Sequence, residues 1–421
     1  MILPRLAMWI ILNTNDERNG RVIYNTRPTP GAILKYFDVT PDENALWHFE
    51  LTVQDGKEYY KIRNHATGLY MHSTNPASGD GETTNAAASD ASLYEVIPLY
   101  QDDSYLIVLK GGKPLWCFEN ERGFVMNRDD RTFKGGSTFK LAIATKQDFA
   151  DIEQQKADEA TYTDVWGDEF DKDGTPDPTK WDYEHGFVRN GEWEWYQPEN
   201  AFVANGSLII EGRKEQDRPN PWYDPNEKHD YRKMRKWINY TSSSVITDKK
   251  KDWLYGRFFV KGKIPVSGGS WPAIWFLGHA EKTGEWPLTG EIDLLEYYTD
   301  DTLGNLCWGE GYWETRRVHF KEYWLKQDPF WNEKWHVWRM DWDERAIKLY
   351  LDDELLNCVL LARMTNPPGS PYENSFKTPQ FLILNLALGA TGGPIDDKDF
   401  PRRYYIDYVR VQQMKKYMQQ Q

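Results

Sequence analysis

The chain is poor in the features that mark several protein classes. Its three cysteines, Cys117, Cys307 and Cys358, are far apart and show neither a disulfide framework nor the spacing of metal ligands. No apolar stretch reaches the roughly 18 residues that suggest a membrane-spanning helix. The short apolar run around Met8 is better interpreted as a strand than as a secretion signal. The sequence therefore predicts no disulfide-stapled module and no membrane span.

Positive charge is also in short supply. The chain has 51 Lys and Arg against 65 Asp and Glu, which gives a net charge of −14. Nucleic acids and anionic membranes attract basic surfaces, so neither is expected as the main partner. The same balance disfavours a heavily sulfated substrate. No P-loop, G-x-S-x-G or paired-His metal motif occurs, so no cofactor is expected for catalysis.

Aromatic residues, in contrast, are abundant. The 421 residues include 20 Trp and 25 Tyr, and 17 of the Trp lie after residue 164. Large aromatic cores and a surface that stacks on sugar rings would both explain the total. The concentration in the second part favours a functional aromatic cleft there. The chain is also too long for one ordinary core, so two domains are expected.

Residues 1–145 contain a weak internal repeat. Aromatic residues recur at Trp9, Trp47, Tyr94 and Phe139, with steps of 38, 47 and 45 residues that mark out three units. Two further strand-like runs follow at similar offsets within each unit. Three such β units resemble the β-trefoil of ricin-type lectins, although the Gln-x-Trp signature of those lectins is not evident. Sugar binding and a packing or spacer role both stay open for this domain.

A helix-prone, polar segment separates this domain from the rest of the chain. Residues 146–163 are rich in Gln, Glu and Ala and have no strand alternation, which is typical of a linker. From 164 to 415, strand patterns such as "YGRFFVKGKIP" and "FLILNLAL" follow one another without a competing long helix. The sequence therefore predicts an all-β chain whose second domain is one large sandwich.

Three acids lie unusually close together in "GEIDLLEYY", residues 290–298. In a strand, Glu291 and Asp293 share one face, whereas Glu296 would fall on the core face with Ile292. An uncompensated buried carboxylate is costly. A β-bulge near Leu294 and Leu295 would return Glu296 to the acidic face. The pattern therefore predicts a bulged strand with three carboxylates lining one side of a groove.

This arrangement is suited to glycoside hydrolysis. One carboxylate attacks the sugar or activates water while the other protonates the leaving oxygen. The third can hold the nucleophile by a hydrogen bond and change the pKa of its partner. A cation site or a surface acidic patch would also place acids together, but calcium favours loops with several carbonyl ligands.

The surrounding sequence resembles glycoside hydrolase family 16, especially its bacterial laminarinases. The likeness rests on "SGGSWPAIWFLG" followed by "EWPLTGEIDLLEYY", with "WGDEFD", "NGEWEWYQPENAFVANGSLIIEGRKE" and "FPRRYYIDYVRV" in the same order as in the family. It covers residues 164–413. The resemblance implies a β-jelly roll of the concanavalin type. It also implies that Glu291 is the nucleophile, Asp293 its orienting partner and Glu296 the acid/base.

The resemblance extends to residues around the acids. Those that it implies for substrate binding are Trp286, Trp271, Trp275, Asn190, Glu192, Trp195, Trp308 and Asn385. Trp286 is the strongest candidate for stacking, core packing is an equal interpretation for Trp275, and Asn385 could be a structural strand amide. Many family members bind a structural calcium. The corresponding ligands here would be the backbones of Glu169 and Gly206 and the residue Asp407.

The implied function is an endo-acting, retaining hydrolase of a β-glucan, at β-1,3 linkages as in laminarin. A β-galactan hydrolase of the same family, such as an agarase-like enzyme, and a non-catalytic carbohydrate-binding protein are the alternatives. The chain departs from laminarinases at Leu306, where they usually have a His two residues before the Trp equated with Trp308. A polysaccharide partner, a monomer and a secreted, periplasmic or cell-surface location are further expectations.

Overall fold

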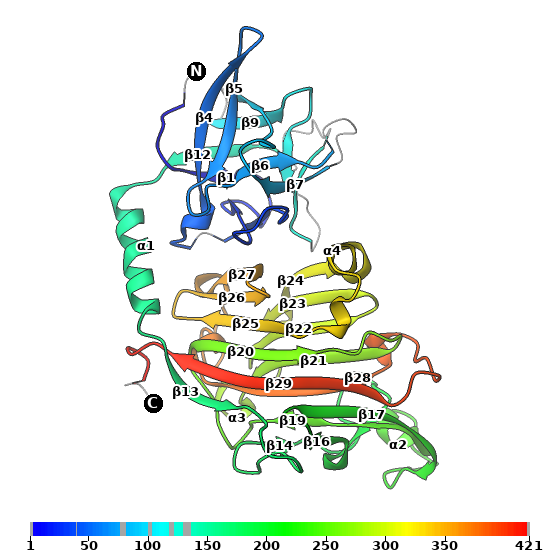
Figure 1. Ribbon diagram of the computed structural model, residues 1–421. Helices are drawn as coiled ribbons and strands as arrows, with labels where there is room; N and C mark the ends of the chain where they lie inside the picture. The colour runs from blue at the N-terminus through cyan, green and yellow to red at the C-terminus, as the bar shows by residue number, and fades with distance from the viewer. Residues whose placement is uncertain are drawn as a thin grey trace. The chain divides into compact units, whose positions relative to one another are not determined.

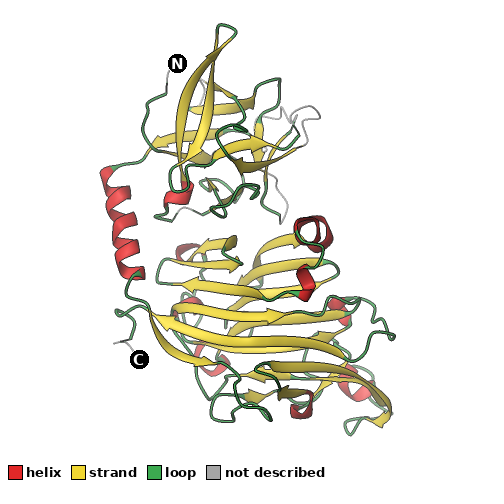
Figure 2. Cartoon of the chain, viewed as in Figure 1, coloured by secondary structure: helices red, strands yellow, loops and turns green. Residues whose placement is uncertain are grey.

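The structure is a computed structural model that describes residues 3–38, 40–75, 81–99, 103–117, 122–128 and 136–418. Strands dominate both halves of the chain (Figures 1 and 2), which confirms the predicted all-β class. Two compact units are present. One comprises Met1–Thr161 with Glu354–Leu360, and the other comprises Tyr162–Asp353 with Leu361–Gln421. None of the described helices is long and apolar enough to cross a membrane.

The first unit contains a twelve-stranded sheet. Its strands are β1 (Met8–Leu12), β2 (Val22–Tyr24), β3 (Lys35–Phe37), β4 (Leu46–Gln54), β5 (Lys57–Asn64), β6 (Tyr70–Ser73), β7 (Gly81–Ala86), β8 (Tyr94–Leu99), β9 (Ser104–Leu109), β10 (Leu115–Cys117), β11 (Val125–Asn127) and β12 (Phe139–Ile143). β12 pairs antiparallel with β1, so the last strand closes on the first. The segment around Met8 is a strand, as predicted.

The aromatic residues of the internal repeat are core residues. Trp47, Tyr94 and Phe139 are fully buried, and Trp9 is nearly so. Trp47, Tyr94 and Phe139 belong to one hydrophobic cluster with Ile and Leu residues of neighbouring strands. The spacing of these aromatics therefore reflects how each strand supplies a large side chain to a shared core.

The segment after β12 forms helix α1 (Lys146–Glu159), which agrees with its helix-prone composition. Thr145 caps the helix, because its side chain accepts from the backbone of Asp148 and the Asp148 side chain accepts from the backbone of Thr145. Only Ile152 is buried, so most of the helix surface is polar and solvated. The predicted domain boundaries at 145, 163 and 415 stay a prediction.

The second unit is a sandwich of two sheets. Its strands are β13 (Thr163–Asp168), β14 (Asp182–Tyr183), β15 (Glu194–Tyr196), β16 (Ala201–Val203), β17 (Leu208–Pro219), β18 (Trp237–Ser242), β19 (Ser244–Ile246), β20 (Gly256–Lys263), β21 (Ser270–Gly278), β22 (Glu291–Tyr298), β23 (Asp301–Trp308), β24 (Tyr312–His319), β25 (His336–Trp342), β26 (Ala346–Leu351), β28 (Gln380–Leu388) and β29 (Arg402–Gln413). β27 (Glu354–Leu360) groups with the first unit.

Helical segments of the described residues other than α1 are short. They are η1 (Glu43–Ala45) in the first unit, and in the second unit η2 (Pro198–Asn200), α2 (Tyr231–Met234), α3 (Ala280–Thr283), η3 (Phe320–Trp324), α4 (Leu325–Gln327), η4 (Trp331–Glu333), η5 (Leu361–Arg363), η6 (Ser375–Lys377) and η7 (Ala390–Gly392).

One sheet of the sandwich has the order β14-β19-β28-β21-β22-β23-β24. The other runs β15-β18-β17-β29-β20-β25-β26, with β13 beside β29 and β16 beside β17. The two sheets pack through their apolar faces, where Phe258 of β20 meets Phe276 of β21 at 4.9 Å between ring centroids. Ile274, Ile292 and Leu294 are fully buried on this side. The opposite face of β21, β22 and β28 is therefore left for polar residues.

Candidate active site

Strand β22 carries the predicted bulge. Asp293 faces Asn305 of β23 and Glu296 faces Leu303, so Leu294 and Leu295 together occupy the space opposite Gly304. Both leucines are buried. The extra residue turns Glu296 to the same side of the sheet as Glu291 and Asp293. The bulge prediction is confirmed, and the side of the sheet that carries these three acids is called the acid face below.

Each outer glutamate is fixed by hydrogen bonds from neighbouring strands or loops. The indole Nε1 of Trp286 donates to Glu291 Oε2 at 2.5 Å. Trp271 Nε1 donates to Glu296 Oε1 at 2.8 Å, and Asn305 Nδ2 donates to Glu296 Oε2 at 2.5 Å. These donors fix the direction of both carboxyl groups.

The pKa values of the three carboxyls on the acid face are shifted by different sets of neighbours. Burial raises the pKa of Glu296 to about 7, and the negative charge of Glu291 adds to this effect. Burial also raises the pKa of Asp293 well above its usual range, with further contributions from Glu291 and Glu296. Burial raises the pKa of Glu291 as well, but hydrogen bonds from Trp286 and Asp293 and the charge of Arg189 oppose the rise. Three such neighbours titrate as one system.

A chain of hydrogen-bonded side chains, called the wall below, lies beside the acid face. Trp275 Nε1 donates to Asn385 Oδ1 at 2.8 Å, and Asn385 Nδ2 donates to Tyr196 Oη at 2.9 Å. Tyr196 and Asn190 reach the two carboxyl oxygens of Glu192 at 3.4 Å and 3.2 Å. Four residues expected from the sequence, Trp275, Asn385, Glu192 and Asn190, are thus brought together by Tyr196.

Glu194 and Arg189 complete this wall. Glu194 is fully buried and accepts from the backbone N–H of Leu388 at 2.7 Å, which fixes β15 against β28. Burial and the nearby Glu192 raise the pKa of Glu194 well above its usual range. The Arg189 guanidinium pairs with Glu184 and lies 4.9 Å from the ring centre of Trp275. Arg189 therefore brings a positive charge close to a group of buried acids.

The predicted tryptophans occupy different environments. Trp286 leaves 52% of its surface exposed while its indole nitrogen holds Glu291, so a face is available for a sugar ring. The indole N–H of Trp271 donates to Glu296, whereas Trp275 is only 7% exposed and belongs to the wall. Trp195 packs edge-to-face against Phe187 and at a tilt against Trp222, on the opposite side of β15 from Glu194 and Tyr196.

Trp308 is not brought to the acids. It is buried beside Tyr312, with 4.7 Å between ring centroids. Strand alternation turns it away from Asn305 and Cys307, which lie across from Asp293 and Glu291. The role expected for Trp308 in substrate binding is therefore corrected to packing at the end of β23.

The same register explains the departure at Leu306. This residue pairs with Ile292 and is fully buried on the core side of β22. The position opposite Glu291 is Cys307, a buried free thiol whose pKa is raised by burial and by Glu291 and Asp293. A change at Leu306 therefore leaves the acid face unaltered.

The residues expected for calcium lie on or next to β29. Asp407 is paired with Lys261 at 2.7 Å, and the Glu169 carboxylate is paired with Arg410 at 2.7 Å. Gly206 lies in the turn before β17 with a φ of +72°. No group of three or more His, Cys, Asp or Glu suited to a metal occurs in the described ranges. Lys261 supplies a positive charge beside Asp407, and the calcium site expected from the backbones of Glu169 and Gly206 stays a prediction.

The sequence matches the profile of the glycosyl hydrolases family 16 over residues 192–412, more than half of the chain. The chain belongs to glycosyl hydrolase family 16. It is therefore a glycoside hydrolase with a jelly-roll catalytic fold, and family 16 enzymes use no catalytic cofactor.

Similar proteins include curated glucanases. A β-glucanase of Rhodothermus marinus is 34% identical over 260 residues, which cover 59% of this chain and 84% of that protein. Glucan endo-1,3-β-glucosidase A1 of Niallia circulans is 29% identical over 270 residues, which cover 59% of this chain and 37% of that larger protein.

A solved structure is similar as well. It comes from work on endo-acting O-glycanases with which prominent human gut bacteria initiate mucin breakdown. The TM-score is 0.54 and the sequence identity 33%, with 62% of this chain and 94% of that chain covered.

Proposed function

We propose that this family 16 enzyme is an endo-acting, retaining hydrolase of a β-glucan, with β-1,3 linkages as in laminarin as its main target. The bulged strand with Glu291, Asp293 and Glu296 on one face carries the proposal, because it supplies two carboxyls with different partners and pKa values. The glucanase names of its relatives from Rhodothermus marinus and Niallia circulans support the substrate class.

The proposed mechanism assigns a separate role to each acid. Glu291, ionised, attacks the anomeric carbon and forms a covalent glycosyl–enzyme ester. Glu296, protonated, delivers its proton to the leaving glycosidic oxygen and then takes a proton from the water that cleaves the ester. Asp293 keeps its proton and donates it in a hydrogen bond to Glu291, which favours the ionised nucleophile. Atoms and charges balance over the two displacements.

The residues around the acids position the substrate in this scheme. Trp286 offers an exposed ring next to the nucleophile, which suits stacking on a sugar. Asn190 and Glu192 present polar atoms for hydroxyl groups from the neighbouring wall. We expect Trp275 and Asn385 to orient that wall without touching the sugar.

Reducing-sugar release from a panel of polysaccharides tests the substrate. Laminarin should yield mixed short oligomers from mid-chain cleavage, while agarose and other neutral β-galactans should react more slowly. Cleavage of the galactans alone would replace the glucan proposal with the β-galactan one and keep the chemistry. Binding without any product would indicate a carbohydrate-binding protein and would contradict the proposal.

The pH dependence of kcat/KM should be bell-shaped. Glu296 must hold its proton, so activity should fall as the pH rises through about 7. Glu291 must be ionised, and its raised pKa places the acid limb above the ordinary glutamate value. Rates on a soluble oligosaccharide measure the profile. In Glu296→Ala, assayed with an activated leaving group, the alkaline limb should disappear, and its persistence would exclude Glu296 as the acid.

Asn305→Ala should move the alkaline limb to higher pH. The Asn305 amide donates to the Glu296 carboxyl and stabilises the ionised form, so its loss raises the pKa of Glu296. We also expect kcat/KM to fall about tenfold, since a hydrogen bond to a charged group is lost. Asn385→Ala is the control, because it should change the rate without moving this limb. An unmoved limb in Asn305→Ala would contradict the role.

We further propose that the first unit is a β-trefoil and that the catalytic domain comprises residues 164–415. Three β units with buried aromatic starts and a closing β12–β1 pair support the trefoil. A monomeric enzyme that acts outside the cytoplasm completes the proposal, because a polysaccharide is too large to enter a cell intact.

A further inference from the structure

The segment between β17 and β18 has a charge opposite to that of the chain. The chain carries −14, yet residues 228–236 contain five Lys or Arg and a single Asp, and the turns before them add only Asp224 and Glu227. This stretch, with the turns before it, is called the basic loop and comprises residues 220–236. A local positive field within an acidic protein attracts anions at that place only, since screening limits its reach to about 10 Å.

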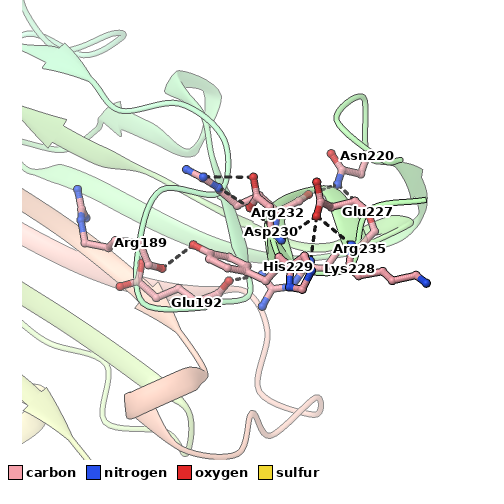
Figure 3. A network of polar contacts seen from close by, with 10 residues as sticks. Arg189, Glu192, Asn220, Glu227, Lys228, His229, Asp230, Arg232 and Arg235 are labelled. Atoms are coloured by element: carbon pink, nitrogen blue, oxygen red, sulfur yellow. Dashed lines mark hydrogen bonds and ion pairs between the residues drawn. The ribbon is translucent and has the colours of Figure 1, made fainter. Parts of the chain in front are cut away.

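The basic loop is held in one shape by internal hydrogen bonds (Figure 3). The Asn220 side chain donates to the carbonyls of Arg232 and Arg235, both at 2.7 Å. The Glu227 carboxylate accepts from three consecutive backbone N–H groups, those of Lys228, His229 and Asp230. A loop ordered in this way presents its side chains without a large ordering cost on binding.

The basic loop is anchored on the segment that forms the wall beside the acids. Tyr231 Oη donates to the carbonyl of Arg189 at 2.9 Å, and Arg235 donates to the carbonyl of Gly191 at 2.6 Å. The ring of Trp222 lies directly on Gly186, where an added Cβ would be 1.9 Å from the ring. The loop is therefore joined to the residues beside Glu192, whose charge acts on Glu296 of the acid face.

Two of the five cations already have partners within the protein. Arg232 pairs with Asp230 at 2.8 Å, and Arg235 lies over the ring of Trp193 at 4.3 Å while it binds backbone carbonyls. The three lysines, Lys228, Lys233 and Lys236, are exposed and form no ion pair with the described residues, and Lys236 lies 5.0 Å from the ring centre of Trp237.

Exposed aromatic rings accompany these lysines. Trp222 and Trp237 each leave 40% of their surface exposed and Tyr223 leaves 39%. Aromatic faces suit sugar rings, and ammonium groups suit sulfate or carboxylate oxygens.

We propose that the basic loop binds an anionic substituent, a sulfate ester or a carboxylate, on the polysaccharide that occupies the acid face. Lys228, Lys233 and Lys236 would contact the anion, and Trp222 and Trp237 the adjoining sugar rings. This inference rests on the proposed function for the identity of the chain that is cut. The net charge of the chain disfavours a densely sulfated polymer as substrate. A basic loop on an acidic protein would still bind a polysaccharide that carries only sparse anionic groups.

The test compares wild type with a protein carrying Lys228→Gln, Lys233→Gln and Lys236→Gln. The substrates are laminarin and the same glucan bearing either sparse sulfate esters or carboxymethyl groups, which separates the two anion sources. The ratio of kcat/KM on an anionic glucan to that on laminarin should fall about fivefold or more through KM, because three exposed charge contacts are lost. Wild type should lose the same preference between about 0.05 M and about 0.5 M NaCl.

The control protein carries Lys249→Gln, Lys250→Gln and Lys251→Gln, a lysine run of equal size in the loop after β19. Its substrate ratio should match that of wild type. An equal fall in both triple variants, or no fall in either, would overturn the inference.

A binding measurement keeps this inference separate from the proposed function. Glu291→Gln protein, with and without the basic-loop substitutions, is run in native gels that contain neutral or sulfated glucan. Retardation by the sulfated glucan that the substitutions abolish supports the loop even if laminarin is never cleaved. Equal retardation by duplex DNA would reveal a general polyanion surface and would contradict a glycan site.

Discussion

Glu291→Gln should lower kcat/KM on a β-glucan by on the order of 10⁴-fold, because the residue is proposed to form the covalent bond. Glutamine has nearly the same shape and still offers an oxygen to the indole N–H of Trp286, which donates to Glu291 in the native protein at 2.5 Å. The neutral amide is a far weaker nucleophile than the carboxylate. Removing a partly buried negative charge should not destabilise the fold.

Initial rates of reducing-sugar release measure this effect, with circular dichroism and thermal unfolding as checks of the fold. Glu281→Gln is the matched control, because its side chain is 75% exposed and lies in α3 of the same unit. The control should retain full activity. More than a tenth of the native rate in folded Glu291→Gln would contradict the assignment of the nucleophile.

Glu296→Ala should show a different pattern of loss and rescue. On a natural glucan, kcat/KM should fall by about 10²- to 10⁴-fold, since general-acid help to the leaving oxygen is lost. An aryl glycoside with an acidic phenol needs little protonation and should still form the glycosyl–enzyme ester. Azide, which needs no general base, should then attack that ester and restore turnover.

The azide product identifies the role of each glutamate. In Glu296→Ala, azide displaces Glu291 from the covalent intermediate, and two inversions give a β-glycosyl azide. In Glu291→Ala, azide can attack only the substrate itself, and one inversion gives an α-glycosyl azide. Proton NMR of the isolated products distinguishes them. The reverse result would exchange the nucleophile and the acid/base.

The acid face could be predicted largely from local rules. Strand alternation and the cost of burying Glu296 were enough to predict a bulge at Leu294 and Leu295, which the structure contains. Asn305 could have been found by the same reasoning. A two-residue turn at Thr299–Asp300, where both φ values are positive, sets the hairpin register, and the bulge then places Asn305 opposite Asp293. That register also turns Trp308 away from the acids.

The wall beside the acids could not be found in this way. Glu194, Tyr196 and Arg189 come from a loop and a three-residue strand whose position depends on contacts with β28, nearly 200 residues later. Nothing in the local pattern sets that distance. Net charge is a single sum over the chain, so it does not reveal the five cations at 228–236.

The aromatic content had two explanations, and the structure contains both fully buried and exposed rings. Trp47, Trp338 and Trp342 fill cores and are fully buried, whereas Trp286, Trp222 and Trp237 keep exposed rings near the proposed binding surfaces. Composition alone cannot distinguish buried from exposed tryptophans, since burial depends on which strand face each residue occupies. The repeat spacing in the first unit was more informative, because it predicted β units that each begin near an aromatic residue, and three of these residues, Trp47, Tyr94 and Phe139, lie in one core cluster.

The anomeric form of the first product tests the central claim, a double displacement by Glu291 and Glu296, most directly. Retaining enzymes hold their two carboxyls about 5–5.5 Å apart, which excludes a water between them, whereas inverting enzymes need about 6.5–9.5 Å. Proton NMR can follow laminarin hydrolysis from the first minutes, before mutarotation mixes the anomers. The account predicts that the β-anomer appears first and the α-anomer grows in later. An initial α-anomer would mean inversion and would contradict the covalent intermediate on Glu291.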